Sequence, residues 1–246
     1  MGARIHEQTI FRSLAKYYDL FYSWKSYEKE AATICALIRA HKTSPGTDLL
    51  EVACGTGKHA QQLKDDFKII GTDLNDAMLR IARQRCPGVT FRRADMVNLN
   101  LGRTFDVVLC LFSSIGYVKT RARLKRTLAN FARHLKPGGV LIVEPWFTPA
   151  KFKTGAVTMI TAGDDTVKMV RQSVSKVRGN VSIMDMHYLI AEKDKGVTHH
   201  VDRHELGLFE REDTLAFMRE AGLQAQFLEE GLMRDRGLYV AVAVKP

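Results

Sequence analysis

The sequence predicts an α/β protein built on a doubly wound, mostly parallel sheet of seven strands. Between residues 48 and 145, short apolar runs alternate with amphipathic helical runs, the pattern of parallel strands joined by crossover helices. After Pro149 β-branched and polar residues alternate across glycine-containing turns, which indicates an inserted antiparallel β segment. We expect one domain over 1–246, with the insertion at 150–205 and a C-terminal antiparallel hairpin.

The parallel part is expected to contain five strands, each a short apolar run that is buried on both faces. These strands are expected at 48–53, 68–73, 89–94, 105–111 and 139–145. Helices are expected at 1–41, 58–66, 75–85 and 120–135. The stretch Lys136–Val140, with its Lys-Pro-Gly-Gly-Val sequence, predicts the end of the last helix and a tight turn into the fifth strand.

The C-terminal part is expected to be richer in β-structure. Residues 156–192 predict two or three long antiparallel strands, with turns at Gly163–Asp165 and Arg178–Asn180. A helix at 211–222 and a closing pair of strands at 224–231 and 237–244 are expected to follow. The inserted strands would either cover a binding site or pair two subunits of a homodimer.

Composition and charge narrow the classes of protein. No apolar run approaches the ~20 residues of a membrane helix, and the N-terminus lacks a secretory apolar core. We therefore expect a cytoplasmic protein without a membrane partner. The four cysteines are widely spaced and form no Cys-x-x-Cys pair, so we expect free thiols and no metal site.

The formal net charge of +10 comes partly from the amphipathic helical stretch 119–136. Its basic residues would form either a solvated helix face or a nucleic-acid face. We favour the solvated face and do not expect a nucleic-acid partner. A basic field would also attract a small phosphorylated molecule.

A glycine-rich turn marks the expected ligand site. Residues 49–63, LLEVACGTGKHAQQL, predict a buried strand, a turn with Gly55 and Gly57, and a helix. Glycine lets backbone approach a ligand closely, and a helix N-terminus attracts anionic groups. The spacing Gly55-x-Gly57-x-x-Ala60 also fits a dinucleotide fingerprint, so this pattern alone leaves NAD and other nucleotide ligands open.

Three acidic residues stand at successive expected strands. Glu51 lies inside a buried strand, where a cationic ligand group such as an α-amino group would offset the cost of its burial. Asp73 ends the second strand, where a carboxylate accepts hydrogen bonds from ribose hydroxyls, and Asp95 ends the third, near an expected adenine amine. Open α/β sheets bind ligands at this edge.

The run Glu51–Gly57, Asp73, Asp95-Met96 and the terminal hairpin resemble the class I S-adenosylmethionine-dependent methyltransferases. The resemblance covers essentially the whole chain. It implies a Rossmann-like methyltransferase sheet and S-adenosylmethionine, rather than NAD, as the cofactor, with S-adenosylhomocysteine as its product. The residues expected to bind the cofactor are Tyr18, Lys25, Glu51, Ala53, Gly55, Thr56, Gly57, Asp73, Leu74, Met78, Asp95, Met96 and Phe112. Among them, Lys25 would meet the cofactor carboxylate.

The strings YYDLFY, VACGTGKH, FSSIGY, VEPWF and RGLYV carry a closer resemblance. They are similar to the enzymes that dimethylate the amino group of dTDP-linked amino sugars, of the desosamine and mycaminose type. The implied substrate-binding residues are Tyr22, Tyr117, Glu144, Pro145, Trp146, Arg171 and Arg236. The chain departs from that family at Tyr117, where histidine is frequent, and at Ile10, where a substrate-facing tyrosine is expected.

Methyl transfer from a sulfonium to an amine depends mainly on positioning, because the donor is already activated. We assign Tyr117 the catalytic role of orienting the amine. Arg171 and Arg236 suit a diphosphate, because guanidinium groups fork onto phosphate oxygens, and Trp146 would stack on a base. The loop Phe112–Ile115 lacks the Asp/Asn-Pro-Pro-aromatic pattern of nucleobase methyltransferases, which argues against a nucleobase acceptor.

The sequence thus predicts a methyltransferase that acts on the nitrogen of a small amine, with a nucleotide-linked amino sugar as the favoured acceptor. Transfer to oxygen or carbon of another small molecule is the alternative within this class. A non-catalytic methyltransferase-like domain that binds nucleic acid or protein is the alternative outside it.

Overall fold

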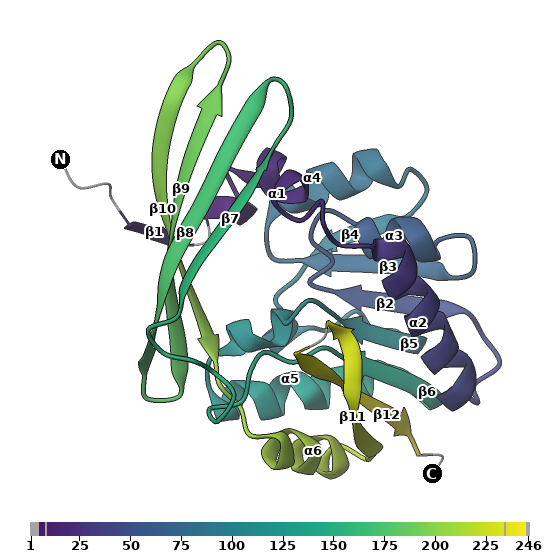
Figure 1. Cartoon of the computed structure of the whole chain (residues 1–246). Helices are drawn as coiled ribbons and strands as arrows, with labels where there is room; N and C mark the ends of the chain where they lie inside the picture. Colours follow the sequence, from purple (N-terminus) through teal and green to yellow (C-terminus); the bar gives the residue numbers. More distant parts are fainter. Residues whose placement is uncertain (1–4, 8, 234, 245–246) are drawn as a thin grey trace.

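The computed structural model describes residues 5–7, 9–233 and 235–244, and it contains two β-sheets. The first sheet has seven strands in the order β11-β12-β6-β5-β2-β3-β4. The second has five, in the order β1-β10-β9-β8-β7. Figure 1 shows the long strands of the second sheet standing beside the first sheet, with α1 between β7 and α4 at one end.

The predicted parallel part is confirmed. Its strands are β2 (Asp48–Val52), β3 (Lys68–Asp73), β4 (Thr90–Arg93), β5 (Phe105–Cys110) and β6 (Leu135–Val143), and neighbouring pairs among them run parallel. The helices of this part are α2 (Tyr27–His41), α3 (Lys58–Leu63), α4 (Asp76–Arg85) and α5 (Arg121–Arg133). Every residue of β5 is buried, as expected for a central strand covered on both faces.

Within the described ranges, three short 3-10 helices complete the connections: η1 (Thr9–Phe11), η2 (Met96–Asn98) and η3 (Ser114–Val118). The last two follow β4 and β5, so both begin at the edge of the sheet where the parallel strands end. This edge is where the acidic residues and the Phe112–Ile115 loop were expected to meet.

The prediction of helix over 1–41 is wrong in part, and residues 1–4 and 8 of this range lie outside the described residues. The described part contains strand β1 (Ile5–Glu7), which pairs in parallel with β10, then η1, helix α1 (Ala15–Phe21) and helix α2. The hydroxyl of Ser26 accepts a hydrogen bond from the Lys29 N–H, so Ser26 caps α2 and starts a separate helix. Pairing of β1 with a strand almost 200 residues away is a tertiary effect that local periodicity does not report.

The expected tight turn at Lys136–Val140 takes a different form. β6 begins already at Leu135, and its pairing with β5 shifts register within this stretch. Gly138 has a φ of 77°, and its carbonyl accepts the N–H groups of Thr43 and Ser44. The glycine therefore permits an excursion inside a strand, which is anchored to the loop after α2.

The two or three antiparallel strands predicted over 156–192 are confirmed as three, and a fourth follows at 196–207. The second sheet contains four antiparallel strands, β7 (Val157–Gly163), β8 (Val167–Arg178), β9 (Val181–Glu192) and β10 (Gly196–Gly207), together with β1. The turns expected at Gly163–Asp165 and Arg178–Asn180 are confirmed. β10 was given no bounds of its own, although most of it falls within the antiparallel segment expected at 150–205. The insertion bounds at 150–205 stay a prediction.

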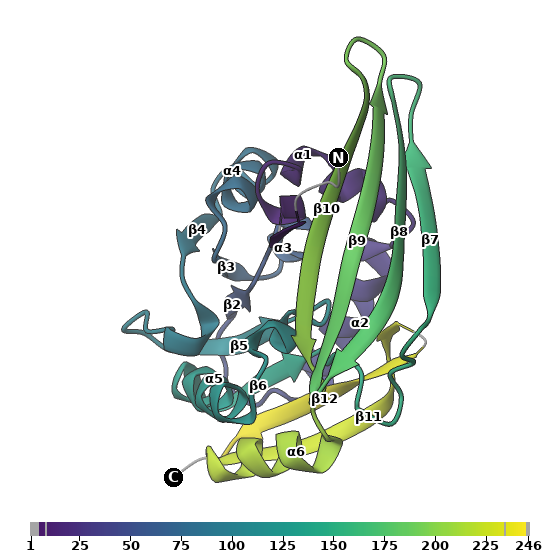
Figure 2. The same ribbon diagram turned by 90° about the vertical axis from the view of Figure 1, so that its left-hand side faces the viewer.

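The second sheet has two unlike faces. On the inner face Met169, Tyr188 and Ile190 are almost fully buried, and they pack against Tyr17 and Phe21 of α1. The register places the exposed Val157, Met159, Val174, Leu189 and Val197 together on the outer face. The strands β7 to β10 are in front in Figure 2.

The C-terminal prediction is confirmed. Helix α6 (Arg211–Glu220) is followed by β11 (Leu223–Met233) and β12 (Arg236–Ala243), which pair as an antiparallel hairpin. β12 also pairs antiparallel with β6 and so joins the hairpin to the parallel strands. In the described ranges, no helix is both long and apolar enough to cross a membrane.

Candidate active site

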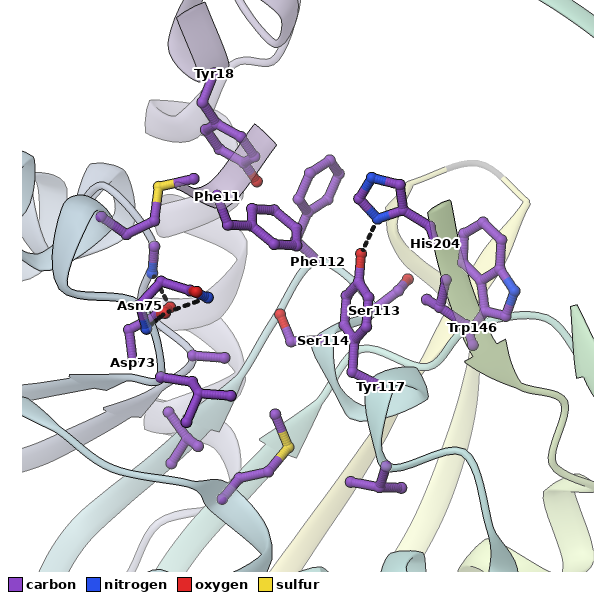
Figure 3. Close-up of a pocket in the computed structure, with 18 of the residues that line it drawn as sticks. Phe11, Tyr18, Asp73, Asn75, Phe112, Ser113, Ser114, Tyr117, Trp146 and His204 are labelled. Carbon is purple, nitrogen blue, oxygen red and sulfur yellow. Dashed lines mark hydrogen bonds between the residues drawn. The ribbon is translucent and has the colours of Figure 1, made fainter. Parts of the chain in front are cut away.

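A cavity of about 540 Å³ lies where the ends of the parallel strands meet α1 and the inner face of the second sheet. Figure 3 shows its two sides, which face one another. The glycine-turn side carries Gly55, Asp73 and Asp95. The insertion side, next to the second sheet, carries Tyr117, Arg171, His204 and Arg236.

The backbone around this cavity is held in uncommon conformations. Among the described residues, four that are not glycine have φ values in the left-handed region: Ala53, Phe112, Ser113 and Lys119. All four line the cavity. Such a conformation costs on the order of 1–3 kcal/mol and concentrates at functional sites, where surrounding structure enforces it. The surrounding fold therefore enforces the backbone conformation of the cavity wall.

The two glycines of the turn have different tasks. Gly55, with a φ of 54°, has no atom within 4 Å of the position that a Cβ would occupy, and it lines the cavity. At Gly57, with a φ of 75°, a Cβ would lie 3.1 Å from the Cβ of Ala82 in α4. Gly57 lines neither this cavity nor a smaller neighbouring one. Gly55 thus keeps a surface open, while Gly57 permits close packing of the turn.

Asp73 is fixed at the cavity wall by backbone donors. Its Oδ2 accepts from the Gly55 N–H at 2.9 Å, and its Oδ1 accepts from the Asn75 N–H at 2.9 Å. Burial raises the pKa of Asp73. A carboxylate has about four acceptor sites, so the remaining lone pairs can accept from ligand hydroxyls. Leu74 and Met78, also predicted at this site, line the same wall.

Asp95 caps η2, because its Oδ1 accepts from the Val97 N–H at 2.9 Å. It also lines the cavity together with Met96. The carboxylate thus has a structural task and still faces the space in which the resemblance expects an adenine. Ala94 and Val97 supply apolar surface beside it.

Glu51 lines a second, smaller cavity of about 40 Å³ that shares Tyr18, Ala53, Gly55, Phe112 and Ser114 with the large one. Its Oε2 is buried and has no hydrogen-bond partner in the described structure. Burial raises the pKa of Glu51 to about 8, and the nearby Asp73 adds to the shift. A ligand ammonium would supply the missing partner, so these residues fit the amino-acid end of S-adenosylmethionine.

Lys25 was expected to meet the cofactor carboxylate. Its ammonium is instead bonded to the Glu30 carboxylate at 2.5 Å, and the ring of Phe112 lies 4.2 Å away. Lys25 lines neither cavity. Glu30 also binds His59 at 2.7 Å. The predicted contact of Lys25 with cofactor would therefore require a rearrangement of this buried ion pair.

Thr56 lines the smaller cavity, and its hydroxyl donates to Asp19 Oδ1 at 2.7 Å. Tyr18 lines both cavities, and burial raises the pKa of its hydroxyl well above the usual value. Tyr22 and Phe112 pack edge to face with ring centres 5.0 Å apart, and both line the large cavity. The predicted aromatic residues therefore form a continuous wall.

On the insertion side, Tyr117 takes part in a buried chain of polar groups. Its hydroxyl lies 2.7 Å from His204 Nδ1, a contact drawn in Figure 3. The Nε2 of His204 lies 3.0 Å from Asp202 Oδ2. Sequence reasoning missed His204 and Asp202, because their contacts with Tyr117 and Ile10 span 87 and 192 residues. The signal for them was the alternation of His200, Asp202 and His204, which places them on one face of a strand.

The two predicted arginines reach the cavity from different sheets. Arg171 of β8 donates to the Tyr22 hydroxyl at 3.0 Å, and Arg236 of β12 donates to Ser113 Oγ at 2.5 Å. The Arg236 guanidinium also lies 4.9 Å from the ring centre of Trp146. Both arginines are therefore held by neighbouring side chains, and both line the cavity.

Trp146 lines the cavity, but its indole N–H donates to Ser182 Oγ at 2.9 Å, and Arg236 lies over the ring. Base stacking on Trp146 would have to use the ring area that remains. Glu144 and Pro145, also predicted to bind substrate, do not line the cavity. Instead Glu144 Oε2 accepts from the Phe112 N–H at 2.6 Å, so it braces the strained loop.

The basic helix α5 is paired with acids of α6. Arg121 forms an ion pair with Asp213, and Lys125 lies 2.6 Å from the Glu220 carboxylate. Next to the helix, Lys119 is paired with Glu205 at 2.9 Å. These contacts favour the interpretation as a solvated face that packs on its neighbour.

The chain is similar to known methyltransferases. Residues 49–139 match the family described as a methyltransferase domain. The dTDP-3-amino-3,4,6-trideoxy-alpha-D-glucopyranose N,N-dimethyltransferase of Streptomyces venezuelae is 41% identical over 93% of this chain and 97% of its own length. The dTDP-3-amino-3,6-dideoxy-alpha-D-glucopyranose N,N-dimethyltransferase of Streptomyces fradiae is 39% identical over 93% of this chain and 90% of its own.

Solved structures agree with these relatives. The crystal structure of Streptomyces venezuelae DesVI has a TM-score of 0.88 and 40% identity, over 94% of this chain and 98% of that one. The S-adenosylmethionine-bound CalS10 of Micromonospora echinaspora, an amino pentose methyltransferase, has a TM-score of 0.83 and 33% identity over 99% of this chain and 100% of its own. The chain therefore belongs to the S-adenosylmethionine-dependent methyltransferases, in the family that contains the dTDP-amino-sugar N,N-dimethyltransferases.

Proposed function

We propose that the protein transfers methyl groups from S-adenosylmethionine to the amino group of a nucleotide-linked amino sugar. One observation carries the proposal: a single cavity joins the glycine-turn side, with Asp73, to the insertion side, with Tyr117 and two arginines. A methyl donor and a phosphorylated acceptor would therefore meet in one enclosed space. The names of the two Streptomyces relatives support the acceptor class.

For the glycine-turn side, we propose that Asp73 binds the ribose hydroxyls, Asp95 the adenine amine, and Glu51 the α-amino group. The unpartnered Glu51 Oε2 and the open space at Gly55 support this assignment. The donor supplies a methyl group already activated by its sulfonium. What the chain adds is position, and an aromatic wall that includes Tyr18, whose ring face would attract a cation.

For the insertion side, we propose that Arg171 and Arg236 bind the diphosphate of the acceptor. Both guanidinium groups line the cavity. Arg171 donates to the Tyr22 hydroxyl and Arg236 to the Ser113 hydroxyl, while Arg236 Nε also donates to the exposed Asp235 carboxylate at 3.5 Å. A phosphate would offer them charge-assisted, bidentate hydrogen bonds, which are about twice as strong as neutral ones. Arg123 also lines the cavity and adds positive charge to it.

The test is a methyltransferase assay with a panel of dTDP- and UDP-linked amino sugars. Formation of S-adenosylhomocysteine is followed, and products are identified by mass spectrometry. We expect mass gains of one and two methyl groups on nitrogen. Methylation of hydroxyl analogues but of no amine would replace the proposal by transfer to oxygen. Salt-dependent RNA binding without any methyl transfer would point to the non-catalytic alternative.

We also propose that two copies of the chain associate through the outer face of the second sheet. Five apolar side chains exposed on that face support this, with Val157 and Val197 exposed to 80% and 70%. Sedimentation of the wild type and of a Val157→Lys/Val197→Lys variant tests it, since a dimer would dissociate in the variant. The cytoplasmic location stays a prediction from the sequence.

A further inference from the structure

Tyr117, His204 and Asp202 form a chain of hydrogen bonds, and the Asp202 end of this chain determines which atom donates in each bond. Asp202 is fully buried, and its Oδ2 accepts a hydrogen bond from the backbone N–H of Ile10 at 2.9 Å. The same oxygen lies 3.0 Å from His204 Nε2. A carboxylate oxygen only accepts, so His204 Nε2 must carry the hydrogen in this contact.

The hydrogen on Nε2 determines the other nitrogen of the ring. In a neutral imidazole with Nε2–H, Nδ1 is an acceptor. The Tyr117 hydroxyl, 2.7 Å from Nδ1, must then donate its only hydrogen to His204. The ring of Phe11 packs edge to face on both rings, with centres 5.5 Å and 5.8 Å away, which restricts their orientation.

We propose that His204 is a positioning residue which makes Tyr117 an obligate hydrogen-bond acceptor toward the bound amine; this rests on the proposed function. Both side chains line the cavity. With its hydrogen committed to His204, the Tyr117 oxygen presents only lone pairs to the acceptor. An amine N–H therefore donates to Tyr117, and the nitrogen lone pair stays free to attack the methyl group. If the Tyr117 hydroxyl donated instead, its hydrogen bond would occupy that lone pair.

The bond changes follow from this orientation. The nitrogen lone pair forms the new N–C bond, while the C–S bond of the sulfonium breaks and its electron pair stays on sulfur. The product ammonium releases one proton to water. After the first transfer and loss of this proton, the resulting secondary amine still has one N–H for Tyr117 and can react again. After the second transfer, the neutral tertiary amine has no N–H. The arrangement supports two transfers and disfavours a third.

The decisive experiment is a double-mutant cycle. Tyr117→Phe should lower kcat by about tenfold to a hundredfold, because the N–H bond to Tyr117 strengthens as nitrogen becomes cationic. His204→Ala should lower kcat by about threefold to tenfold, because the Tyr117 hydroxyl can then rotate and donate. The double variant should be no slower than Tyr117→Phe alone, since His204 acts through Tyr117. KM for the acceptor and affinity for S-adenosylhomocysteine should change less than twofold.

Two further variants separate positioning from mere structure. His204→Asn places an amide oxygen near the position of Nδ1 and should recover kcat to within about threefold of wild type. His199→Ala removes a histidine from the exposed face of the same strand and should leave kcat unchanged. The proposal would be overturned if the decrease in kcat of the double variant equalled the product of the decreases caused by Tyr117→Phe and His204→Ala.

A measurement without any acceptor keeps this proposal distinct from the proposed function. Long-range ¹⁵N–¹H correlation spectra of the unliganded protein should show His204 protonated at Nε2 and unprotonated at Nδ1. In Tyr117→Phe only the Nδ1 signal should shift strongly. A hydrogen on Nδ1 would overturn the proposal even in an active enzyme. If the protein methylates no amino-sugar nucleotide but His204 has the expected tautomer, the proposed acceptor is wrong. The inference that the Tyr117 hydroxyl donates to His204 would still hold.

Discussion

The two sides of the cavity are assembled over very different distances in the sequence. On the glycine-turn side, the contacts Asn75–Asp73 and Val97–Asp95 each span two residues, and Gly55–Asp73 spans 18. On the insertion side, Tyr117–His204 spans 87 residues, Arg236–Ser113 spans 123 and Arg171–Tyr22 spans 149. The first side is made by local backbone geometry, and the second by side chains brought together by tertiary structure.

This difference has a physical reason. A ligand held by strand ends and a helix N-terminus uses backbone groups whose positions follow from the order of strands. A ligand held by side chains from two sheets depends on how those sheets pack. On the glycine-turn side, substitution of Asp73 or Asp95 should therefore cause a large loss of cofactor affinity. The insertion side should respond to substitution by graded losses in acceptor binding and rate.

The largest effect is expected from Asp73→Ala. Two ribose hydroxyls would lose a charged acceptor, and each such hydrogen bond contributes about 1.5–3 kcal/mol. Affinity for S-adenosylhomocysteine should therefore fall at least about a hundredfold, measured by titration calorimetry. The unliganded variant should also melt at a lower temperature, because the Gly55 and Asn75 N–H groups lose their acceptor.

Asp76→Ala is the matched control for Asp73→Ala. Asp76 lies in the first turn of α4, its side chain is exposed, and it pairs with Arg93. Its removal should leave affinity for S-adenosylhomocysteine within about twofold. Equal affinity in the wild type and Asp73→Ala would remove Asp73 from the cofactor site.

Arg236→Ala should have the next largest effect, and on the other side of the cavity. Loss of a charge-assisted contact to a diphosphate should raise KM for a nucleotide-linked amino sugar by about tenfold to a hundredfold. Arg236→Lys should recover part of the loss, because it keeps the charge but not the fork. Affinity for S-adenosylhomocysteine should stay constant in both variants. Arg211→Ala, which removes an arginine paired with Glu229, is the control. A normal KM in Arg236→Ala would refute the diphosphate assignment.

A smaller effect is expected from pH, through Glu51. Its pKa is raised from 4.5 to about 8 in the unliganded protein, so the folded state binds more protons than the unfolded state in this window. Stability of the unliganded protein should therefore fall as pH rises from 4.5 to about 8. A ligand ammonium favours the ionised carboxylate, so binding should release a proton below pH 8.

Affinity for S-adenosylhomocysteine should consequently rise by about threefold to tenfold per pH unit between pH 6 and 8. Calorimetry in buffers of different ionisation enthalpy would measure the proton release directly. Glu51→Gln should remove both the slope and the proton release, while His41→Gln, at the far end of α2, should keep them. A pH-independent affinity in the wild type would place the ligand ammonium elsewhere.

The same contrast explains what the sequence could predict. The parallel strands, the glycine turn and the lining positions of Asp73 and Asp95 follow from periodicity and local motifs, and the structure has them. The strand β1 and the position of the His204–Asp202 pair depend on how β10 pairs with β1 and packs at the cavity, which local patterns do not report. Glu144 was expected to bind substrate because of the family resemblance, but its contact with Phe112 depends on a left-handed backbone that no pattern reports.

The smallest effect is expected from Lys125 of the basic helix α5, which does not line the cavity, unlike Arg123 of the same helix. Lys125 is paired with Glu220 on the surface, and such exposed pairs contribute about 0–1 kcal/mol. Lys125→Ala should therefore leave kcat/KM within about twofold and shift the free energy of unfolding by less than about 1 kcal/mol. Kinetics at two ionic strengths provide the measurement. If kcat/KM instead dropped, and dropped less at high salt, α5 would contribute to attracting the charged acceptor, and the insertion side would extend beyond the residues that line the cavity.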